Sequence, residues 1–257
     1  MNAHIGREGL TMKTFYKVQG TLKAHAHFTK NGNIKLGGNV WTFSKLFGDF
    51  NYTIEDDNGM HEIIGSCGHY CNGCKKACYV KSSYRYPSVV KCHTENTMAF
   101  REDIGGAFND LYNQISNARN KPDLIRINQS GEIESHNGFI LWCSLAMCFP
   151  YVKFWVYTKA FDLVKASIPY LPENLTVNFS IWHEYGLEEY IEAKNFKGVN
   201  AFAYVDKDFT IERYQAEGLA IQTTCKAYEN GKLNHSITCH KCGKCFHSGL
   251  VIGCNEH

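Results

Sequence analysis

Cysteines are the residues of this chain best suited to chemistry, and eight of the twelve fall into two groups. The first group lies within one short stretch and consists of Cys67, Cys71, Cys74 and Cys78. The second lies near the C-terminal end and consists of Cys225, Cys239, Cys242 and Cys245. A chain of 257 residues does not need disulfides as staples, and they are rare in reducing compartments. Because thiolates bind zinc and iron-sulfur clusters, the two groups predict two metal sites.

The first cysteine group has the dense spacing that is typical of iron-sulfur proteins. Structural zinc is tetrahedral and usually joins two ligand pairs that are well separated in sequence. Four thiolates within twelve residues are closer to ferredoxin spacing. We therefore predict a 4Fe-4S cluster here, with a four-cysteine zinc site as the alternative.

The second group has the spacing C-x2-C-x2-C over residues 239–245 and needs a fourth ligand. Cys225 follows the last predicted strand and is the preferred candidate, while Cys254 lies downstream and is the alternative. A second 4Fe-4S cluster fits this spacing. A zinc ribbon also fits, and His240 or His247 could then replace a cysteine. Spacing alone does not separate the two kinds of site.

Strand-like and helix-like segments alternate through the middle of the chain. Six strand candidates follow in order: HEIIGS, LIRIN, KFWVYT, LTVNFSIW, NAFAYVD and GLAIQTT. Apolar residues at helical spacing predict helices between them, and the most regular helix runs from Met98 to Ala118. Strands that alternate with helices in this way are usually parallel and joined by crossovers. The pattern predicts an α/β fold, a partial (βα)6 TIM-like barrel.

Three regions follow from this pattern. Residues 1–60 carry short apolar runs broken by turn signals and predict an extended N-terminal cap. We expect residues 61–224 to form the partial barrel with the first cluster. We expect residues 225–257 to form a C-terminal cysteine-rich segment with the second cluster. Active sites of such folds lie at the carboxyl ends of the strands. We expect both cysteine groups, the loop after LIRIN and the segment from Ser180 to His183 to meet there.

Charge and hydropathy disfavour two classes of protein. The formal charge is +2, from 27 basic and 25 acidic residues without long runs of one sign, so the balance does not support a nucleic-acid partner. No segment approaches 18 consecutive apolar residues, which predicts that the chain does not span a membrane. The start of the chain lacks the apolar stretch of a signal peptide. We therefore expect a soluble cytoplasmic protein.

The stretch from Cys67 to Cys74 has the spacing C-x3-C-x2-C and resembles the signature of radical S-adenosylmethionine (SAM) enzymes. In that family three thiolates bind three irons of a 4Fe-4S cluster, and the fourth iron is open to SAM. The loop Ser130-Gly131-Glu132 is similar to the glycine-glycine-glutamate loop that contacts the SAM amino group. The resemblance implies a partial barrel of radical SAM type, with Ser180 or His183 at the ribose or carboxylate of SAM.

Two residues depart from the radical SAM pattern. Gly73 stands where the family usually has an aromatic residue before its third cysteine. Cys78 supplies a fourth thiolate that could close the cluster. A closed cluster would carry electrons but could not bind SAM.

Three functions remain open from the sequence. The radical SAM resemblance implies an enzyme that generates a 5'-deoxyadenosyl radical, which takes hydrogen from a substrate that the sequence does not identify. A reductant protein such as flavodoxin or ferredoxin would then be a partner. The first alternative, favoured by Cys78, is a non-enzymatic iron-sulfur protein that acts as an electron carrier or interaction module. The second is a zinc-stabilised nucleic-acid-binding module, which the charge balance disfavours.

A second resemblance covers more of the chain, roughly Val40 to Phe246. The pieces CKKACY, SSYRYPSV, IRINQSGEIES, PYVKFWVYTKAF and TCHKCGKCF are similar to a family of phage-encoded, gene-product-eighty-eight-like proteins. This family implies the host cytoplasm as location, and it brings no activity with it. Its emphasis falls on Cys67, Cys74 and Cys78, with Cys71 as the variable member. Which of these cysteines bind the first cluster therefore stays open.

Overall fold

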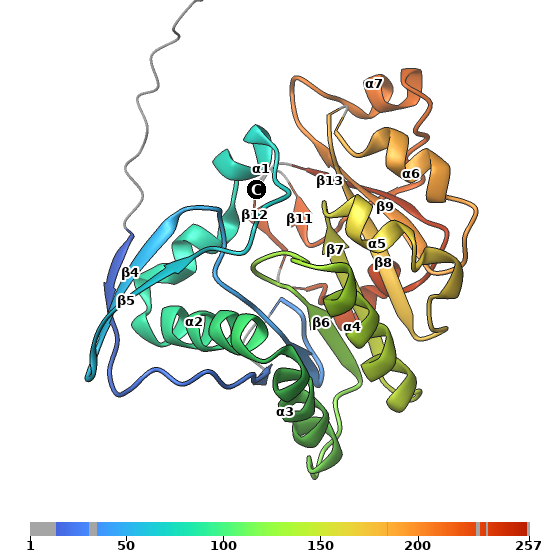
Figure 1. Cartoon of the computed structure of the whole chain (residues 1–257). Helices are drawn as coiled ribbons and strands as arrows, with labels where there is room; N and C mark the ends of the chain where they lie inside the picture. The colour runs from blue at the N-terminus through green and yellow to red at the C-terminus, as the bar shows by residue number, and fades with distance from the viewer. Residues whose placement is uncertain (1–13, 31–34, 184, 230–231, 235, 256–257) are drawn as a thin grey trace, which may run out of the picture.

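The computed structural model describes residues 14–30, 35–183, 185–229, 232–234 and 236–255, and an eight-stranded sheet forms its centre (Figure 1). The strand order is β10-β13-β9-β8-β7-β6-β3-β2. Neighbouring strands are parallel except at one edge, where β2 is antiparallel to β3. The strands are β2 (Thr29–Lys30), β3 (Val40–Thr42), β6 (Leu124–Ile127), β7 (Lys153–Thr158), β8 (Leu175–Trp182), β9 (Val199–Val205), β10 (Thr223–Thr224) and β13 (Val251–Asn255).

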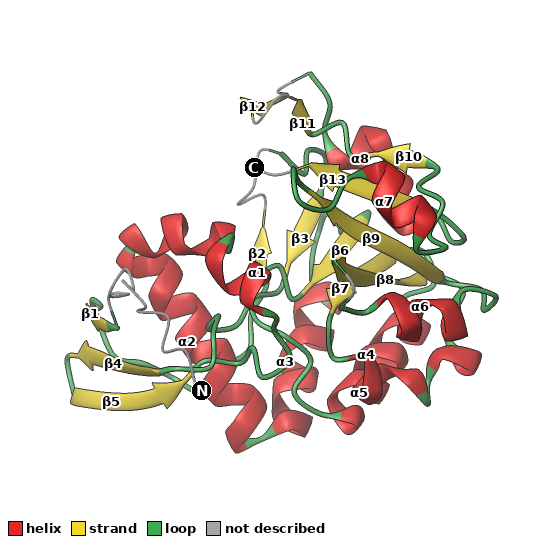
Figure 2. Cartoon of the chain, turned by 90° about the horizontal axis from the view of Figure 1, so that it is seen from above, coloured by secondary structure: helices red, strands yellow, loops and turns green. Residues whose placement is uncertain are grey.

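Helices lie along one face of this sheet (Figure 2). They are α3 (Ile104–Ser116), α4 (His136–Cys148), α5 (Phe161–Lys165), α6 (Leu187–Ala193) and α7 (Ile211–Ala216). A 3-10 turn (Ile168–Tyr170) follows α5. The helices share one apolar core with the sheet, to which β8 contributes Val177, Phe179 and Ile181. This packing of helices on a mostly parallel sheet is typical of α/β proteins.

The opposite face of the sheet is polar and aromatic, although it is largely buried. In β8 the buried Thr176, Asn178 and Ser180 alternate with the apolar residues that face the helices. Side chains alternate between the two faces of a strand, so these three share the face away from the helices. Parallel strands are usually apolar on both faces. A polar face at this position therefore marks where a functional site is expected.

A separate three-stranded sheet lies beside the large one (Figure 1). It consists of β1 (Phe15–Lys17), β4 (Asn51–Asp56) and β5 (Gly59–Ile64), in the order β1-β4-β5. Helix α2 (Pro87–Glu102) joins the two parts, because Val90 packs in the core of the small sheet and Ala99 in that of the large one.

The remaining elements are short and lie in the two cysteine-bearing segments. They are α1 (Asn72–Lys76), a 3-10 helix (Tyr79–Arg85), β11 (Tyr228–Glu229), β12 (Lys232–Leu233), α8 (Cys239–Cys242) and a 3-10 turn (Lys244–Phe246). The strands β11 and β12 form an antiparallel hairpin.

The predicted partial (βα)6 barrel of radical SAM type is wrong. The large sheet is open, with β2 at one edge and β10 at the other. HEIIGS does not begin it, because this segment forms β5 of the small sheet, and GLAIQTT contributes only the two residues of β10. The place beside β6 is taken by β3 from the N-terminal region, and β13 from the C-terminal end inserts between β9 and β10. In the described residues the two edge strands, β2 and β10, do not pair with each other, so the sheet does not close into a barrel.

The predicted helix from Met98 to Ala118 is two helices. Asp103 interrupts it with extended backbone (φ −150°, ψ 88°), and its carboxylate accepts a hydrogen bond from the amide of Gly106 at 2.9 Å. This capping bond begins α3 in a new direction. Helical spacing continued across the break, so periodicity alone did not reveal it.

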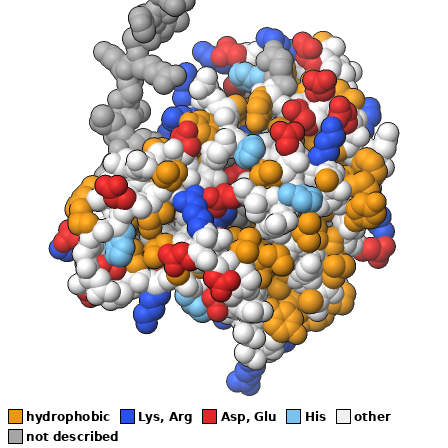
Figure 3. Space-filling model, in the orientation of Figure 1, with side chains coloured by type: hydrophobic (Ala, Val, Ile, Leu, Met, Phe, Trp, Pro, Cys, Tyr) orange, Lys and Arg blue, Asp and Glu red, His pale blue; other side chains and the backbone are white. Residues whose placement is uncertain are grey.

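The three predicted regions all reach the large sheet. Residues 1–60 supply β2 and β3, residues 61–224 supply β6 to β10, and residues 225–257 supply β13. Basic and acidic side chains are interspersed on the face seen in Figure 3, and apolar side chains gather at its lower right. Within the described part of the chain, no helix has the length and apolar character that a membrane span requires.

Candidate metal centre

A cavity of about 330 Å³ opens on the polar face of the large sheet, and both cysteine groups border it. The first group contributes Cys67, Cys74 and Cys78. The second contributes Cys225, Cys239, Cys242 and Cys245, and Cys254 lies in the same wall. The fold thus brings seven of the eight predicted cysteine ligands to one space, although the two groups are far apart in the chain.

Backbone hydrogen bonds tie the first group to the loop that follows β3. The amide of Ser66 donates to the carbonyl of Leu46 at 2.8 Å, and the amide of Cys67 donates to the carbonyl of Gly48 at 2.7 Å. The Ser66 hydroxyl donates to the same Leu46 carbonyl at 2.6 Å. Cys67 is therefore held beside the carboxyl end of β3, the end at which open α/β sheets bind ligands.

Cys71 differs from the other members of the first group. It is the N-cap residue of α1, and its Sγ accepts a hydrogen bond from the amide of Cys74 at 3.4 Å. It is absent from the wall of the cavity, to which Cys67, Cys74 and Cys78 all contribute. In this arrangement Cys71 caps the helix, and the other three cysteines border the cavity.

The Ser130-Gly131-Glu132 loop packs directly on the residue before Cys67. Lys45 and Ser130 exchange hydrogen bonds, from the Lys45 amide to the Ser130 carbonyl at 2.9 Å and from the Ser130 hydroxyl to the Lys45 carbonyl at 2.8 Å. Gly131 has φ +82°, and a Cβ there would lie 2.4 Å from Ser66 Oγ. Only glycine suits this close approach. The loop therefore borders the cavity beside Cys67.

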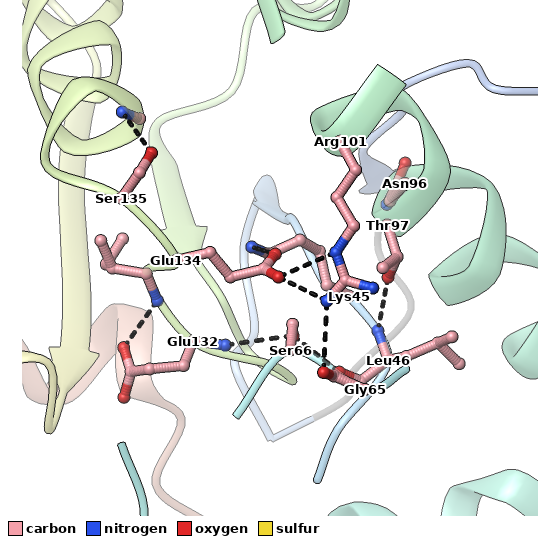
Figure 4. A network of polar contacts seen from close by, with 12 residues as sticks. Lys45, Leu46, Gly65, Ser66, Asn96, Thr97, Arg101, Glu132, Glu134 and Ser135 are labelled. Carbon is pink, nitrogen blue, oxygen red and sulfur yellow. Dashed lines mark hydrogen bonds and ion pairs between the residues drawn. The ribbon is translucent and has the colours of Figure 1, made fainter. Parts of the chain in front are cut away.

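An ion-pair network fixes the same region from the helix side (Figure 4). The buried Lys45 ammonium donates to Glu134 at 2.5 Å, and the Arg101 guanidinium also pairs with Glu134. Arg101 further donates to the carbonyls of Ile64 at 2.6 Å and Gly65 at 3.2 Å. The network joins α2 to the end of β5 and to the segment after Glu132. These contacts make the cysteine-bearing loop part of the folded framework.

Glu132 is buried in the cavity wall, and the chain itself holds its carboxylate. Oε1 accepts hydrogen bonds from the Ile133 amide and the Thr158 hydroxyl, both at 2.8 Å. Oε2 accepts from the Lys159 amide at 2.8 Å. Burial tends to lower the pKa of Lys159, but Cys74 and Glu132 outweigh it, and the pKa is raised. Lys159 is thus a cation near the first cysteine group.

Backbone contacts place the second group against residues that precede β3. The amides of Cys239 and His240 donate to the carbonyls of Lys35 and Leu36 at 3.0 and 2.8 Å. The short helix α8 is capped at its start by Thr238, whose hydroxyl accepts from the Lys241 amide at 3.3 Å, and is followed by the left-handed Gly243. The dense cysteine spacing is therefore carried on one tight turn.

Two buried asparagines of the sheet form hydrogen bonds to the backbone of the second cysteine turn. Asn178 Nδ2 donates to the carbonyl of Cys245 at 2.9 Å, and Asn200 Nδ2 donates to the carbonyl of His247 at 2.7 Å. Asn200 Oδ1 accepts from the amide of Leu250 at 2.9 Å. The polar face of the sheet thus satisfies the backbone of the cysteine turn, which explains why asparagine replaces an apolar residue in these strands.

Cys225 and Cys254 are neighbours at the edge of the sheet. The amide of Cys225 donates to the carbonyl of Gly253 at 2.7 Å, which places its side chain beside that of Cys254. A hydrogen bond from the Cys254 thiol lowers the pKa of Cys225, although burial opposes this shift. Both sulfurs border the cavity, so both predicted candidates for the fourth ligand lie within reach of the second group.

The structure separates Ser180 from His183. Ser180 borders the cavity, and its Oγ accepts a hydrogen bond from Trp182 Nε1 at 3.2 Å. His183 is not in the cavity wall. Its Nε2 lies 3.0 Å from Asp206 Oδ2, and its ring stacks on Phe209 at 5.0 Å. These contacts account for His183 without a ligand.

No sequence motif marks the cations and aromatic rings of the cavity. Four cationic residues border it: Lys35, Arg126, Lys159 and Lys244. Trp182 and Tyr204 stack at 4.0 Å in the same wall. Alternation along the strands was the available signal, because Arg126 lies between the buried Ile125 and Ile127 in β6.

The donor set of the cavity suits iron-sulfur clusters. Within the described residues, no three side chains of Cys, His, Asp or Glu converge closely enough to hold a single metal ion. The thiols are spread around the cavity wall, and cysteine thiolates are the usual ligands of 4Fe-4S clusters. Burial raises the pKa of Cys67 and of Cys245 to about 12, so a bound cation is needed to deprotonate them near neutral pH. Neighbouring lysines and arginine would offset the negative charge of the thiolates.

Comparison with known proteins identifies the family. No curated protein and no solved structure matches the chain. The family described as gene product 88 matches residues 21–248, which include both cysteine groups and strands β6 to β9. The match confirms the resemblance to gene-product-eighty-eight-like proteins. The chain therefore belongs to the gene product 88 family.

Proposed function

We propose that this protein is an iron-sulfur protein with two 4Fe-4S clusters on opposite sides of one cavity, and that the first cluster acts on SAM. The observation that carries the proposal is the shared wall, in which thiols of both cysteine groups border the same space of about 330 Å³. A cavity of this size suits a small molecule. Electron transfer or radical chemistry on such a molecule is the function that the arrangement supports best.

The first cluster would be held by Cys67, Cys74 and Cys78. These three thiols border the cavity, while Cys71 caps α1. A reduced cluster held by these residues would supply one electron to SAM. Glu132 and Ser130 lie in the adjacent wall, which is where the SAM amino group would be received. Lys159 would offset thiolate charge on this side.

The second cluster would be held by the turn at 239–245 together with Cys225 or Cys254. Lys244 lies in this turn and donates to the Thr224 carbonyl at 3.2 Å and to the Thr223 hydroxyl. Lys35 is half-buried and lies near Cys225 and Cys239. These two cations would stabilise the thiolates of a bound cluster.

The carrier function is a second candidate, and the position of Cys78 supports it. Its thiol faces the cavity with Cys67 and Cys74, and Cys71 is only one helical turn from Cys74. A rotation of Cys71 away from its cap would supply a fourth thiolate and close the cluster. The protein would then exchange electrons with a reductant such as flavodoxin or ferredoxin without binding SAM.

Anaerobic reconstitution tests the proposal. Two 4Fe-4S clusters require about eight irons and eight sulfides per chain. About four of each, with zinc present, would mean that one group binds zinc instead. Stoichiometric zinc without sulfide would reject the iron-sulfur assignment.

Electron paramagnetic resonance with and without SAM separates the enzyme from the carrier. For the enzyme, Cys71→Ala should keep the first cluster, Cys78→Ala should lose it, and SAM should change the spectrum of the wild type. For the carrier, all four substitutions in the first group should alter the cluster, and SAM should have no effect. Cys92→Ala is the matched control, because this half-buried cysteine lies outside the cavity.

A further inference from the structure

Two polar residues at the carboxyl end of β6 border the cavity. Arg126 lies within β6, and Asn128 follows the last residue of that strand. Both residues border the cavity, and Asn128 also borders a smaller cavity beside Phe100 and Trp142. Neither belongs to a cysteine group or to the Ser130-Gly131-Glu132 loop.

The polar atoms of these two side chains lack partners. Among the described residues, four buried side-chain nitrogen or oxygen atoms form no hydrogen bond, and three of them are Arg126 Nε, Asn128 Nδ2 and Asn128 Oδ1. Asn128 is only 5% exposed. Leaving a buried polar group unpaired costs about 1–3 kcal/mol, so native proteins rarely do so without a reason. Three such atoms on residues 126 and 128 indicate that a ligand supplies the missing hydrogen-bond partners.

The charge of Arg126 is also incompletely matched. One of its terminal nitrogens donates to Tyr79 Oη at 3.1 Å, and the guanidinium lies 4.9 Å from the centre of the Tyr157 ring. In the described part of the chain, no carboxylate forms an ion pair with it. Glu132, which borders the same cavity, is already bound by Thr158 and the Lys159 amide.

The backbone of Asn128 supports a functional position. Its φ is +49°, in the left-handed region that residues other than glycine rarely adopt. Asparagine tolerates this region better than most residues. Strained backbone of this kind concentrates at binding sites, because the rest of the fold must hold it.

We propose that Arg126 and Asn128 bind the oxyanion group, carboxylate or phosphate, of a small ligand in the cavity. A guanidinium donates two parallel hydrogen bonds to such groups. The Asn128 amide would donate to the same oxyanion through Nδ2, and Oδ1 would accept from a hydroxyl or amino group next to it. The identification of this ligand as the substrate rests on the proposed function, whereas the binding itself requires only the two side chains.

Equilibrium dialysis of the full-length protein, purified without oxygen, tests this inference. The probes are radiolabelled inorganic phosphate and radiolabelled lactate, at an ionic strength held constant with chloride. We expect saturable binding of at least one probe, with one site per chain. Which of the two binds distinguishes a phosphorylated ligand from a hydroxycarboxylate.

Three variants locate the site. Arg126→Gln removes the cation, and Asn128→Asp keeps the shape while adding a negative charge, so each should weaken binding at least tenfold. Arg119→Gln removes an exposed arginine outside the cavity and should bind like the wild type. Iron and sulfide are measured in all samples.

The iron content separates this inference from the proposed function. If protein without iron binds the probe, the oxyanion site is supported and the proposal of iron-sulfur clusters is rejected. The site is rejected if the iron-loaded wild type binds neither probe, or if Arg126→Gln binds as tightly as the wild type. It is also rejected if Asn128→Asp loses iron together with binding, since the residues would then serve the clusters. Displacement of the probe by SAM would reject the inference of a ligand other than SAM, because Arg126 and Asn128 would then bind the SAM carboxylate.

Discussion

Gly73 lies against the ring of Trp182, so closely that a Cβ on Gly73 would be 2.9 Å from the Cε3 atom of Trp182. The ring cannot easily move aside. It stacks on Tyr204 at 4.0 Å, and its Nε1 donates to Ser180 at 3.2 Å. The tryptophan of β8 therefore fills the space beside the cysteine loop, where the radical SAM pattern has an aromatic residue before its third cysteine.

Gly73→Phe should displace the first cysteine loop. Overpacking of a filled site costs roughly 1–3 kcal/mol, so we expect a loss of this size in the free energy of unfolding, measured by urea denaturation. Iron content should fall as well. Adding Trp182→Ala should recover part of both losses, and Gly68→Ala should be harmless because nothing lies within 4 Å of a Cβ there. A Gly73→Phe protein as stable as the wild type would contradict this packing.

Gly131→Ala should destabilise the protein more than Gly249→Ala. Both glycines have φ +82°, so backbone strain of roughly 1 kcal/mol is common to the two variants. Only Gly131 adds a steric conflict, with Ser66 Oγ at 2.4 Å and Lys45 Cβ at 2.9 Å, whereas Gly249 has nothing within 4 Å. The difference between the two urea midpoints measures the contact between the loop and the residue before Cys67. Equal midpoints would mean that the loop is not packed there.

Asn200→Ala should release the second cysteine turn while keeping the first group in place. It leaves the His247 carbonyl and the Leu250 amide without their partner, and each unpaired group costs about 1–3 kcal/mol. We expect iron to fall by about half if each group binds one 4Fe-4S cluster. Asn174→Ala is the control, because Asn174 Nδ2 donates to the carbonyls of Ala146, Phe149 and Val152, which lie outside the cavity wall. That variant should lose stability without a specific loss of iron, and equal iron loss in both would refute the anchoring role.

Stability should decline in mild acid because of His93. This histidine is buried beside Tyr84, with Nδ1 3.1 Å from the phenol oxygen, and burial lowers its pKa from 6.5 to about 3. Below pH 6.5 the His93 side chain therefore binds a proton in the unfolded chain, whereas in the folded chain it stays neutral until about pH 3. Within that window the free energy of unfolding should fall as the pH falls, by about 1.4 kcal/mol for each pH unit from this group.

His93→Gln should remove this contribution. Urea denaturation at several values between pH 6.5 and 4.5 would show a shallower decline than in the wild type. The range stops above the ordinary pKa values of Asp and Glu side chains, about 3.9 and 4.3. Parallel curves for the two proteins would show that His93 is not the group responsible.

Much of this protein follows from its sequence. LIRIN, KFWVYT, LTVNFSIW and NAFAYVD all correspond to parallel strands of the large sheet, β6 to β9, because each is a short apolar run followed by a helix. The grouping of the cysteines is local too, since residues three or four apart in sequence lie within one short stretch of chain whatever the rest of the fold. The family match over residues 21–248 agrees with the resemblance that these segments carry.

The tertiary structure alone decided how the sheet ends and what the cavity contains. β3 and β13 are short runs of three and five residues, and their places depend on packing with β6 and β9, which are distant in sequence. The role of Cys71 depends on where α1 begins, and the importance of Arg126 and Asn128 depends on which face of β6 is left without helices. Such outcomes come from long-range burial, in which a polar side chain is forced to find a partner or a ligand, and no local pattern of residues encodes that partner.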